Sequence, residues 1–184
     1  MTVGGPTRAF SRRDFDKMIR AGIIGEDERL ELIGGRILVM SPESPLHAGT
    51  IDLCAEVLHW MFDAGHTVLV QHPLAVDPDD EPEPDLAVVR DDPRDQLADH
   101  PHEAVLIVEV AESSLERDRG EKALLYARAG FPDYWIVNLI DRRVEVHRDP
   151  TPDGYLSVVS LAAEDEIVPL GAPSSRLAVA ALLP

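Results

Sequence analysis

The sequence predicts an α/β fold in which helices pack on a central mixed β-sheet. Short runs of apolar and β-branched residues, typical of strands, alternate along the chain with longer segments of helical periodicity. The run AVLIVEVA at 104–111 is apolar at almost every position, as expected for a central strand covered on both faces. The chain has 184 residues, of which 45% are hydrophobic, and this suits one domain spanning residues 1–184.

The N-terminal third predicts two helices on either side of a β-hairpin. Ser11 can cap the first helix, and Ser44 can cap the second, with Pro45 in its first turn. Gly34 and Gly35 lie between two short apolar runs, which is a tight hairpin signal. We therefore expect helices over 11–22 and 44–65 and a hairpin over 29–41.

The middle of the chain predicts strands separated by polar loops. The stretch DPDDEPEP at 77–84 is acidic and rich in proline, so it cannot lie inside a sheet. The polar stretch 91–103 has the composition of a second loop. Around these loops we expect one or two strands over 67–76, a short strand over 85–90 and the central strand over 104–111.

The C-terminal part predicts one well-defined helix followed by further strands. Ser113 and Glu116 have the spacing of a capping box at the start of this helix, and Gly130 with Pro132 marks its end. Beyond it we expect strands over 134–139, 143–148, 155–161 and 167–170, and a short final helix over 174–183. The order of hairpin, helix, strands, helix and strands indicates a mixed sheet with helices packed on it.

The charge of the chain is strongly negative and unevenly distributed. The net charge is −17, and residues 41–112 hold seventeen acidic but only two basic side chains. This balance disfavours loose binding to nucleic acid or to anionic membranes. The single cysteine, Cys54, excludes a disulfide within the chain, and neither a signal peptide nor an apolar run of about 20 residues is visible. We therefore expect a cytoplasmic protein without a membrane segment.

Three carboxylates in apolar surroundings are the main functional signal. Glu109 lies inside the apolar strand, where an ionised carboxylate is costly unless a partner compensates it. Glu31 lies between two leucines, and Asp85 opens a strand. Asp85 and Glu109 are on consecutive strands and can be neighbours in the sheet. Two adjacent carboxylates repel each other, and a hard cation such as Mg²⁺ removes that penalty.

Lys122 is one of only two lysines in a chain with fifteen arginines. Lysine, unlike arginine, can lose its proton when its pKa is shifted. Leu115, Lys122 and Tyr126 share one face of the predicted helix, and the rise of helix and strand allows Lys122 to reach Glu109. Asp118, one turn earlier, can orient the lysine. Two interpretations stay open: a buried Glu109–Lys122 ion pair without a metal, or a lysine that acts beside a metal on an attacking water.

Three stretches taken together resemble a known family. The succession EPEPDLAVV, LIVEVAESS and DRGEKALLYARAGFPDYWIV is similar to that of the Uma-two family of putative restriction endonucleases, and the resemblance extends over residues 29–148. The third stretch is the most specific of the three. The resemblance implies the PD-(D/E)XK nuclease-like fold, with a restriction endonuclease-like core, and a nuclease activity.

The resemblance also implies a metal site. Pro84 and Asp85 match the proline–aspartate pair of the family's motif, and Glu109 matches its second acid. By this correspondence Asp85, Glu109 and a backbone carbonyl near Val110 would hold Mg²⁺, with Mn²⁺ as a substitute. The metal would activate a water molecule and offset the charge that builds up on the phosphate.

The lysine of the motif departs from the usual position. It would fall two residues after the second acid, where this chain has Ala111. In this family a lysine on the following helix is thought to replace it, and Lys122 matches that position. Glu31 matches an additional acidic position of the family. The resemblance therefore implies four catalytic residues: Asp85, Glu109, Lys122 and Glu31.

Several other side chains can belong either to the site or to the scaffold. His47, in the first turn of its helix, can face the same cleft, although a histidine at a helix start is more often a surface residue. Gln71 allows the same two interpretations. Arg119 can contact phosphate, although a solvated helix charge is the commoner case. Three aromatic residues are expected in the core: Tyr126, Tyr134 and Trp135.

Two functions fit the sequence. The first is a Mg²⁺-dependent endonuclease that hydrolyses phosphodiester bonds in nucleic acid, with DNA as the expected substrate. The second is a catalytically weak or inactive interaction protein that keeps the nuclease fold as a homodimer, and the net charge of −17 favours it because DNA binding normally requires a basic surface. A homodimer is expected in either case. A basic rim around the cleft of Asp85 and Glu109 would favour the first function, and an acidic rim the second.

Overall fold

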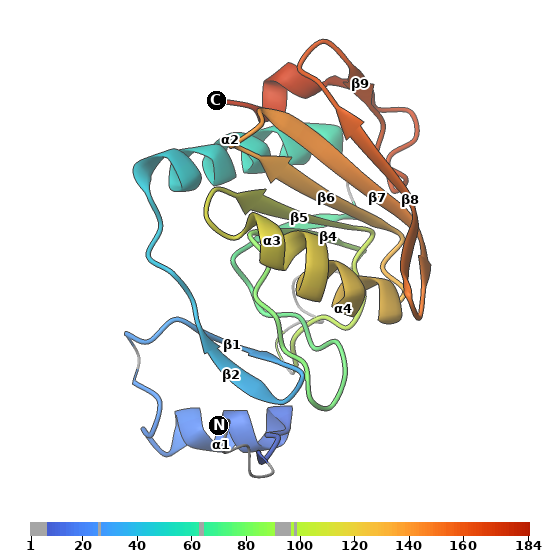
Figure 1. Cartoon of the computed structure of the whole chain (residues 1–184). Coiled ribbons are helices and arrows are strands. Elements are labelled where there is room, and N and C mark those ends of the chain that lie inside the picture. Colours follow the sequence, from blue (N-terminus) through green and yellow to red (C-terminus); the bar gives the residue numbers. More distant parts are fainter. Residues whose placement is uncertain (1–6, 26, 63–64, 91–96, 98) are drawn as a thin grey trace, which may run out of the picture.

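Six strands form one continuous sheet in the order β3-β4-β5-β6-β7-β8 (Figure 1). The computed structural model describes residues 7–25, 27–62, 65–90, 97 and 99–184 of the chain. Strands β5 and β6 run parallel, and every other neighbouring pair in this sheet is antiparallel. The strands are β3 (Thr67–Val70), β4 (Leu86–Val89), β5 (Leu106–Ala111), β6 (Asp133–Asn138), β7 (Arg143–Thr151) and β8 (Gly154–Leu161). The mixed α/β architecture predicted from the sequence is confirmed.

The parallel pair requires a crossover, because parallel strands cannot be joined by a tight turn. The crossover from β5 to β6 contains three consecutive helical segments: α3 (Leu115–Arg117), the π-helical turn η2 (Asp118–Lys122) and α4 (Ala123–Arg128). The hydroxyl of Tyr134, on β6, donates a hydrogen bond to the carbonyl oxygen of Asp118 at 3.0 Å, within the π-helical turn. The sheet therefore contacts the crossover at the turn that carries Lys122.

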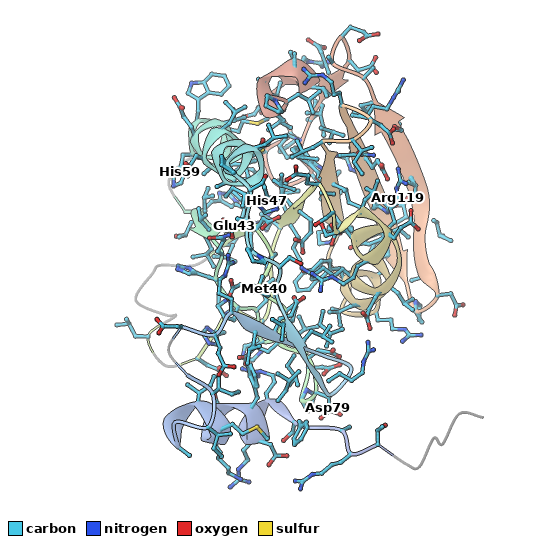
Figure 2. All side chains as sticks on the ribbon, turned by 60° about the vertical axis from the view of Figure 1, so that its left-hand side comes forward. Met40, Glu43, His47, His59, Asp79 and Arg119 are labelled. Atoms are coloured by element: carbon cyan, nitrogen blue, oxygen red, sulfur yellow. The ribbon has the colours of Figure 1, made fainter. Side chains whose placement is uncertain are left out.

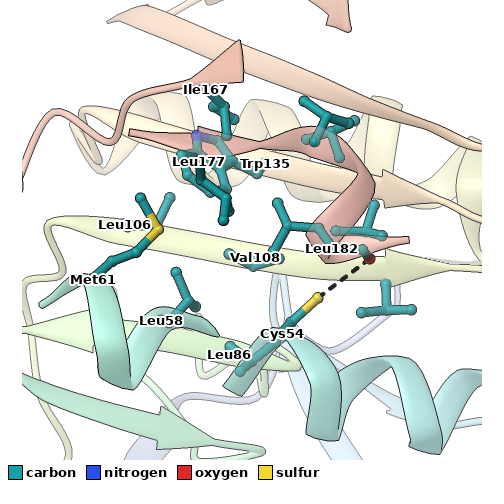
Figure 3. Close-up of a cluster of buried hydrophobic side chains, with 14 of the residues drawn as sticks. Cys54, Leu58, Met61, Leu86, Leu106, Val108, Trp135, Ile167, Leu177 and Leu182 are labelled. Atoms are coloured by element: carbon teal, nitrogen blue, oxygen red, sulfur yellow. Dashed lines mark hydrogen bonds between the residues drawn. The ribbon is translucent and has the colours of Figure 1, made fainter. Parts of the chain in front are cut away.

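Each face of the sheet has its own hydrophobic core. Helix α2 (Pro45–Met61) and the 3-10 turn η3 (Val179–Leu182) cover one face, around Trp135 and Cys54, whose Sγ lies 3.8 Å from the carbonyl oxygen of Leu182 (Figure 3). Helix α4 covers the other face. Side chains alternate between the faces along each strand. On β5 the first core receives Leu106, Val108 and Val110, and the second receives Ile107 and Ala111.

The N-terminal helix and hairpin form a separate layer beside the sheet (Figure 1). Helix α1 (Arg12–Arg20) has Ser11 as its N-cap, and β1 (Leu30–Ile33) pairs with β2 (Arg36–Val39). Gly34 and Gly35 have φ values of 57° and 68°, which the tight turn between the two strands requires. Leu32 and Glu81 exchange backbone hydrogen bonds of 3.1 and 2.7 Å, which attach the hairpin to the acidic loop 77–84. The predicted N-terminal helix and hairpin are thus confirmed.

The helix predicted over 113–130 differs from the structure in its start and its regularity. The N-cap is Ser114 rather than Ser113, and no side-chain capping bond is made at this end. Ser114 instead donates its hydroxyl hydrogen to Asp118. The capping box predicted for Ser113 and Glu116 was therefore wrong, because the helix begins one residue later, after Ser114. The end near Gly130, whose φ is 81°, agrees with the prediction.

The remaining corrections are smaller. The second helix ends at Met61 instead of near Gly65. The segment 67–76, where one or two strands were expected, holds one strand. The predicted C-terminal helix is instead β10 (Leu177–Ala178) followed by η3, because Leu177 pairs with Ile167 of β9 (Glu166–Ile167). Of the predicted loop 91–103, residues 91–96 and 98 lie outside the described residues. Among the described residues, no helix is long and apolar enough to cross a membrane.

Candidate active site

Glu109 lies at the centre of a group of buried charged residues. By the alternation along β5, its side chain is on the face of Ile107 and Ala111, toward the crossover helix. Oε1 of Glu109 accepts hydrogen bonds from Nζ of Lys122 at 2.9 Å and from the hydroxyl of Tyr126 at 2.8 Å. The carboxylate in the middle of an apolar strand therefore has two partners within the protein.

Lys122 is the last residue of the π-helical turn, and only 2% of its side chain is exposed. Its ammonium group lies 2.9 Å from Glu109 and 3.4 Å from Oε2 of Glu31. The contact between Lys122 and Glu109 that the sequence allows is present in the structure. Lys122 thus joins the central strand to the N-terminal hairpin, which carries Glu31.

Glu31 reaches this group from β1 and is fully buried. Oε1 of Glu31 lies 3.2 Å from the guanidinium of Arg117, and Oε2 faces Lys122. Neither oxygen makes a hydrogen bond of good geometry among the described residues. Glu31 is therefore held by the charges of a lysine and an arginine from the same crossover helix.

Asp85 stands at the start of β4, next to the end of β5. Leu86 pairs with Val108, and the same register continued by one residue places Asp85 opposite Glu109. Oδ2 of Asp85 accepts a hydrogen bond from the backbone N–H of Val110 at 2.7 Å. The two carboxylates expected on neighbouring strands are therefore neighbours in the sheet.

His47 lies against Asp85, with its Nε2 atom 3.4 Å from Oδ2. The interaction with Asp85 raises the pKa of His47, and burial opposes this rise. Ser44 caps α2 by accepting a hydrogen bond from the backbone N–H of His47 at 3.1 Å, which fixes this first turn. Of the two interpretations of His47, the structure therefore supports the one in which the histidine faces the cleft. The N-terminus of α2 meets the sheet at Asp85, so His47 does not lie on the open surface.

The buried group holds more negative than positive charge. Burial raises the pKa of Glu109 to about 8; Lys122 opposes the rise, and Asp85 and Asp118 add to it. Burial alone would lower the pKa of Lys122, but Glu109, Glu31 and Asp118 outweigh burial and raise that pKa above its ordinary value. Burial likewise raises the pKa of Asp118. Lys122 therefore stays protonated while several carboxylates compete for it.

A cavity of about 350 Å³ lies over this group. Its lining includes His47, Asp85, Glu109, Asp118 and Lys122. The other charged residues of the lining are Arg29, Glu43, Glu112, Glu116 and Arg117. Six carboxylates thus line the cavity beside two arginines and one lysine. Each arginine is already paired with an acid, Arg29 with Glu43 and Glu83, and Arg117 with Glu31, so the rim is acidic rather than basic.

The other residues singled out in the sequence have mostly structural positions. Arg119 makes a two-point contact with Glu145, at 2.9 and 2.6 Å, and does not line the cavity (Figure 2). Gln71 donates its backbone N–H to the carbonyl of Asp85 at 2.9 Å and its side chain to Glu43, so it braces the cavity wall. The three aromatic residues expected in the core are fully buried: Tyr126, Tyr134 and Trp135.

Two contributions to the site were missed in the sequence. Tyr126 belongs to the core as expected, but its hydroxyl also donates to Glu109. Its spacing of four residues from Lys122 on one helix face was the signal that could have indicated this. Arg117 balances Glu31, and no local pattern connects these two residues because they are far apart in the sequence.

The donors around Asp85 suit a hard divalent cation. The carboxylates of Asp85 and Glu109 and the carbonyl oxygen of Val110 are all oxygen donors, which Mg²⁺ and Mn²⁺ accept. Within the part of the chain that the structure describes, no group of three or more His, Cys, Asp or Glu side chains is placed to hold one ion. The arrangement therefore fits an ion that takes one or two carboxylates and keeps several waters, and it does not fit a closed cage of four side chains.

Comparison with known proteins agrees with this fold. The family model Uma2, described as putative restriction endonuclease, matches residues 12–180. No curated protein matches the chain significantly. A solved structure described as a putative nuclease belonging to DUF820, from Anabaena variabilis ATCC 29413, shares the fold with a TM-score of 0.74 and 16% identity, over 94% of this chain and 97% of that one. The chain therefore belongs to the Uma2 family of putative restriction endonucleases.

Proposed function

We propose that the protein is an endonuclease of the PD-(D/E)XK type that hydrolyses phosphodiester bonds in nucleic acid, with DNA as the expected substrate. The observation that carries the proposal is the meeting of Asp85, Glu109 and Lys122 at one cavity, from three different elements. Membership of the Uma2 family supports a nuclease-like activity. The carboxylates come from neighbouring strands and the lysine from the crossover helix, and these three side chains line the same cavity.

In this proposal Asp85, Glu109 and the carbonyl oxygen of Val110 hold Mg²⁺, or Mn²⁺ as a substitute. When bound, such an ion lowers the pKa of a coordinated water and offsets negative charge on the phosphate. The hydrogen bond from the N–H of Val110 orients the carboxylate of Asp85. Lys122 and Tyr126 orient the carboxylate of Glu109 by donating to the same oxygen, which leaves the second oxygen for the ion.

Lys122 acts in this proposal as a donor and not as a base. Its pKa is raised by Glu109, Glu31 and Asp118 against the effect of burial, so the ammonium keeps its proton. An ammonium group has three N–H donors, and Lys122 lines the cavity. One N–H is given to Glu109, and another can orient the attacking water or the phosphate.

Cleavage assays with a metal titration test the proposal. The purified protein is incubated with double- and single-stranded DNA and with RNA, with Mg²⁺ or Mn²⁺ varied from zero. We expect cleavage that requires the metal and falls by about 100-fold or more in Asp85→Asn and Glu109→Gln. The matched control is Glu116→Gln, because Glu116 lines the same cavity but its side chain is 96% exposed. Equal cleavage in all four proteins would indicate a contaminating nuclease.

The acidic rim favours the second function, an interaction protein with weak or no activity. A nucleic-acid backbone is repelled by the six carboxylates of the cavity unless cations intervene. Under this alternative the buried charges only hold the hairpin and crossover to the sheet. Absence of cleavage at every metal concentration, with wild-type folding confirmed, would select this function over the nuclease.

A homodimer is part of both proposals, and the edge strand β8 is the surface that supports it. The strand GYLSVVSL has no charged residue, and Leu156 and Val158 are 78% and 54% exposed. Exposed edge strands normally carry charges that prevent pairing. Two copies of a chain with a net charge of −17 repel each other, so an uncharged strand is a favourable meeting point. Light scattering should show a dimer that Val158→Lys disrupts, whereas Trp60→Lys, at another exposed apolar residue, leaves it intact.

A further inference from the structure

Two arginines and one lysine of the described chain line the cavity, and they differ in how many of their N–H donors are already used. Arg29 donates to Glu43, and its Nη2 atom donates to Glu83 at 2.9 Å. Lys122 is buried, with its ammonium between two carboxylates. Both of these cations are therefore committed to acids of the protein itself, and Arg117 is the third.

Arg117 keeps most of its donors free. Its Nη1 atom lies 3.2 Å from Oε1 of Glu31, and this ion pair is its only direct polar contact among the residues that the structure describes. Oε1 of Glu31 accepts no hydrogen bond from any of these residues, so the contact is an ion pair alone. A guanidinium has five N–H donors, and the Arg117 side chain is 32% exposed and lines the cavity. Its free donors can therefore meet a ligand in the cavity.

Arg119, two residues later on the same crossover, is an example of an arginine whose planar fork is fully used. Its Nε and Nη2 atoms donate to the two oxygens of Glu145 at 2.9 and 2.6 Å. Arginine matches a carboxylate in this way because its fork presents two parallel N–H groups. Arg117 does not form such a pair with Glu31. Balancing the charge of Glu31 therefore leaves the fork of Arg117 unused.

The π-helical turn η2 brings Arg117 and Lys122 to one carboxylate. Arg117 faces Oε1 of Glu31, and Lys122 lies 3.4 Å from Oε2. In a regular α-helix, residues five apart point about 140° away from each other, whereas the hydrogen bonds of a π-helical turn join residues five apart. The turn directly follows Arg117 and ends at Lys122. Glu31 is fully buried, so it holds the arginine beside the lysine of the proposed site.

Six carboxylates line the cavity, so a phosphate group is repelled over most of its wall and attracted where a guanidinium has free donors. We propose that Arg117 is a substrate-binding residue whose guanidinium binds a phosphate of the nucleic-acid strand that is cut. Phosphate oxygens accept two parallel N–H bonds from the planar fork, while Glu31 keeps the arginine in place. The inference rests on the proposed function, and it adds a residue outside the four that the motif implies.

Steady-state cleavage kinetics of Arg117→Gln test the inference. The loss of a contact that the substrate and the transition state share raises KM and leaves kcat unchanged. For the DNA or RNA that wild type cuts, we expect KM to rise about tenfold or more, the factor associated with one charge-assisted hydrogen bond, and kcat to stay as in wild type. Circular dichroism and an unfolding curve show whether the variant is folded.

The salt dependence of KM separates a phosphate contact from a structural role. A cation that neutralises a phosphate releases counterions, so log KM rises with log [KCl], by about 0.9 for each contact on double-stranded DNA and about 0.7 on a single strand. Arg117→Gln should reduce this slope by about that amount, at one fixed Mg²⁺ concentration. A residue that only supports the fold would leave the slope unchanged.

Arg119→Gln is the matched control. It removes one arginine from the same crossover, with a side chain that is 39% exposed, and it also takes the partner from a buried acid, Glu145, but Arg119 does not line the cavity. Its KM and salt slope should equal those of wild type. If Arg117→Gln behaves like this control, Arg117 only balances Glu31 and the inference is overturned. A lower kcat at unchanged KM, or a higher KM at an unchanged salt slope, would overturn it equally.

Arg117→Lys provides the test if the charge beside Glu31 is needed for folding. Lysine keeps the charge but lacks the fork, so KM should rise severalfold while the salt slope stays as in wild type. A wild-type KM in Arg117→Lys would overturn binding by the guanidinium. If wild type cleaves no nucleic acid at any metal concentration, the proposed function fails and the inference fails with it. If wild type cleaves and Arg117→Gln matches the control, the inference fails alone.

Discussion

The ammonium nitrogen of Lys122 lies 2.9 Å from Oε1 of Glu109, and both side chains are almost completely withdrawn from water. A buried pair of this kind contributes to stability only while both charges are present, because either partner alone would be an uncompensated charge. The same lysine also faces Glu31, so one side chain balances acids from two separate layers of the fold.

Removal of the Lys122 charge should therefore destabilise the protein. Lys122→Met is expected to lower the free energy of unfolding by roughly 3–5 kcal/mol, the cost of leaving a buried charge without its partner. Urea unfolding followed by circular dichroism measures the change. The control is Lys17→Met, at the only other lysine, whose side chain is 62% exposed. A loss as small as that of the control would mean that the carboxylates become protonated at little cost.

Lys122→Arg tests whether cleavage requires the ammonium group of Lys122 itself or only a positive charge at this position. Arginine keeps the positive charge but replaces the compact ammonium by a larger planar group, whose N–H donors lie at different points. We expect most of the stability lost in Lys122→Met to return, whereas cleavage falls by about 100-fold or more, because the donor to the attacking water or the phosphate is displaced. The measurement is cleavage of a substrate that wild type cuts, with unfolding curves in parallel. Near-full cleavage in Lys122→Arg would remove the ammonium from the mechanism.

Metal should stabilise the folded protein. The carboxylates of Asp85 and Glu109 repel each other without a cation, and a ligand that binds only the native state raises its stability by mass action. We expect Mn²⁺ or Mg²⁺ to raise the melting temperature of wild type but not of the double variant Asp85→Asn, Glu109→Gln. Asp79→Asn, on the acidic loop 77–84, is the control and should keep the rise. A rise in melting temperature that persists in the double variant but is lost in Asp79→Asn would place the metal on that loop.

Tyr126→Phe should report on the orientation of Glu109. The hydroxyl of Tyr126 donates to Glu109 at 2.8 Å inside the core, so its removal leaves a carboxylate oxygen with one donor fewer. We expect a loss of about 1–3 kcal/mol in the free energy of unfolding, together with altered Mn²⁺ affinity. Tyr155→Phe is the matched control, because its hydroxyl donates to the carbonyl of Phe131 at 2.9 Å, away from the site. Its Mn²⁺ affinity should equal that of wild type.

Asp80 should make the stability of the hairpin depend on pH. Burial raises the pKa of Asp80 to about 6 from an ordinary value of 3.8, although a hydrogen bond from the backbone N–H of Gly34 opposes the rise. The folded state therefore binds the proton more tightly than the unfolded chain, and this contribution to stability, complete below about pH 4, is lost as the pH rises through 6.

Asp80→Asn keeps an acceptor for Gly34 and removes the titration. Its stability relative to wild type should therefore increase between pH 4 and pH 7, by at most about 3 kcal/mol for the full shift. Unfolding curves at a series of pH values measure the difference, with Asp52→Asn, at an exposed residue of α2, as the control. A difference that is constant with pH would show that Asp80 does not titrate in this range.

Local patterns in the sequence were sufficient for the centre of the sheet. Alternation along the strands and their consecutive order placed Asp85 beside Glu109, and helical spacing placed Lys122 within reach. These relationships depend on the regular geometry of strands and helices, which the sequence encodes within a few residues. The hairpin turn at Gly34 and Gly35 was predictable for the same reason.

The relationships that were not predicted depend on packing between distant segments. His47 and Asp85 meet because α2 starts at the edge of the sheet, and no periodicity of α2 reveals this. Ser114 bonds to Asp118 instead of capping the helix, since the carboxylate is held there by the π-helical turn. A π-helical turn adds one residue to a helix without a recognisable sequence signal, so the helix appeared regular in the sequence.

The helical crossover between β5 and β6 has a consequence for the order in which the protein folds. It brings Lys122 and Tyr126 to Glu109 across only 13 and 17 residues of chain, whereas Glu31 and Asp85 are much more distant from the lysine in the sequence. Closing a short loop costs less entropy than closing a long one, and contacts that are local in sequence form faster. The strand–helix–strand unit 106–138 can therefore acquire its ion pair early, and the late docking of the hairpin then withdraws the pair from water.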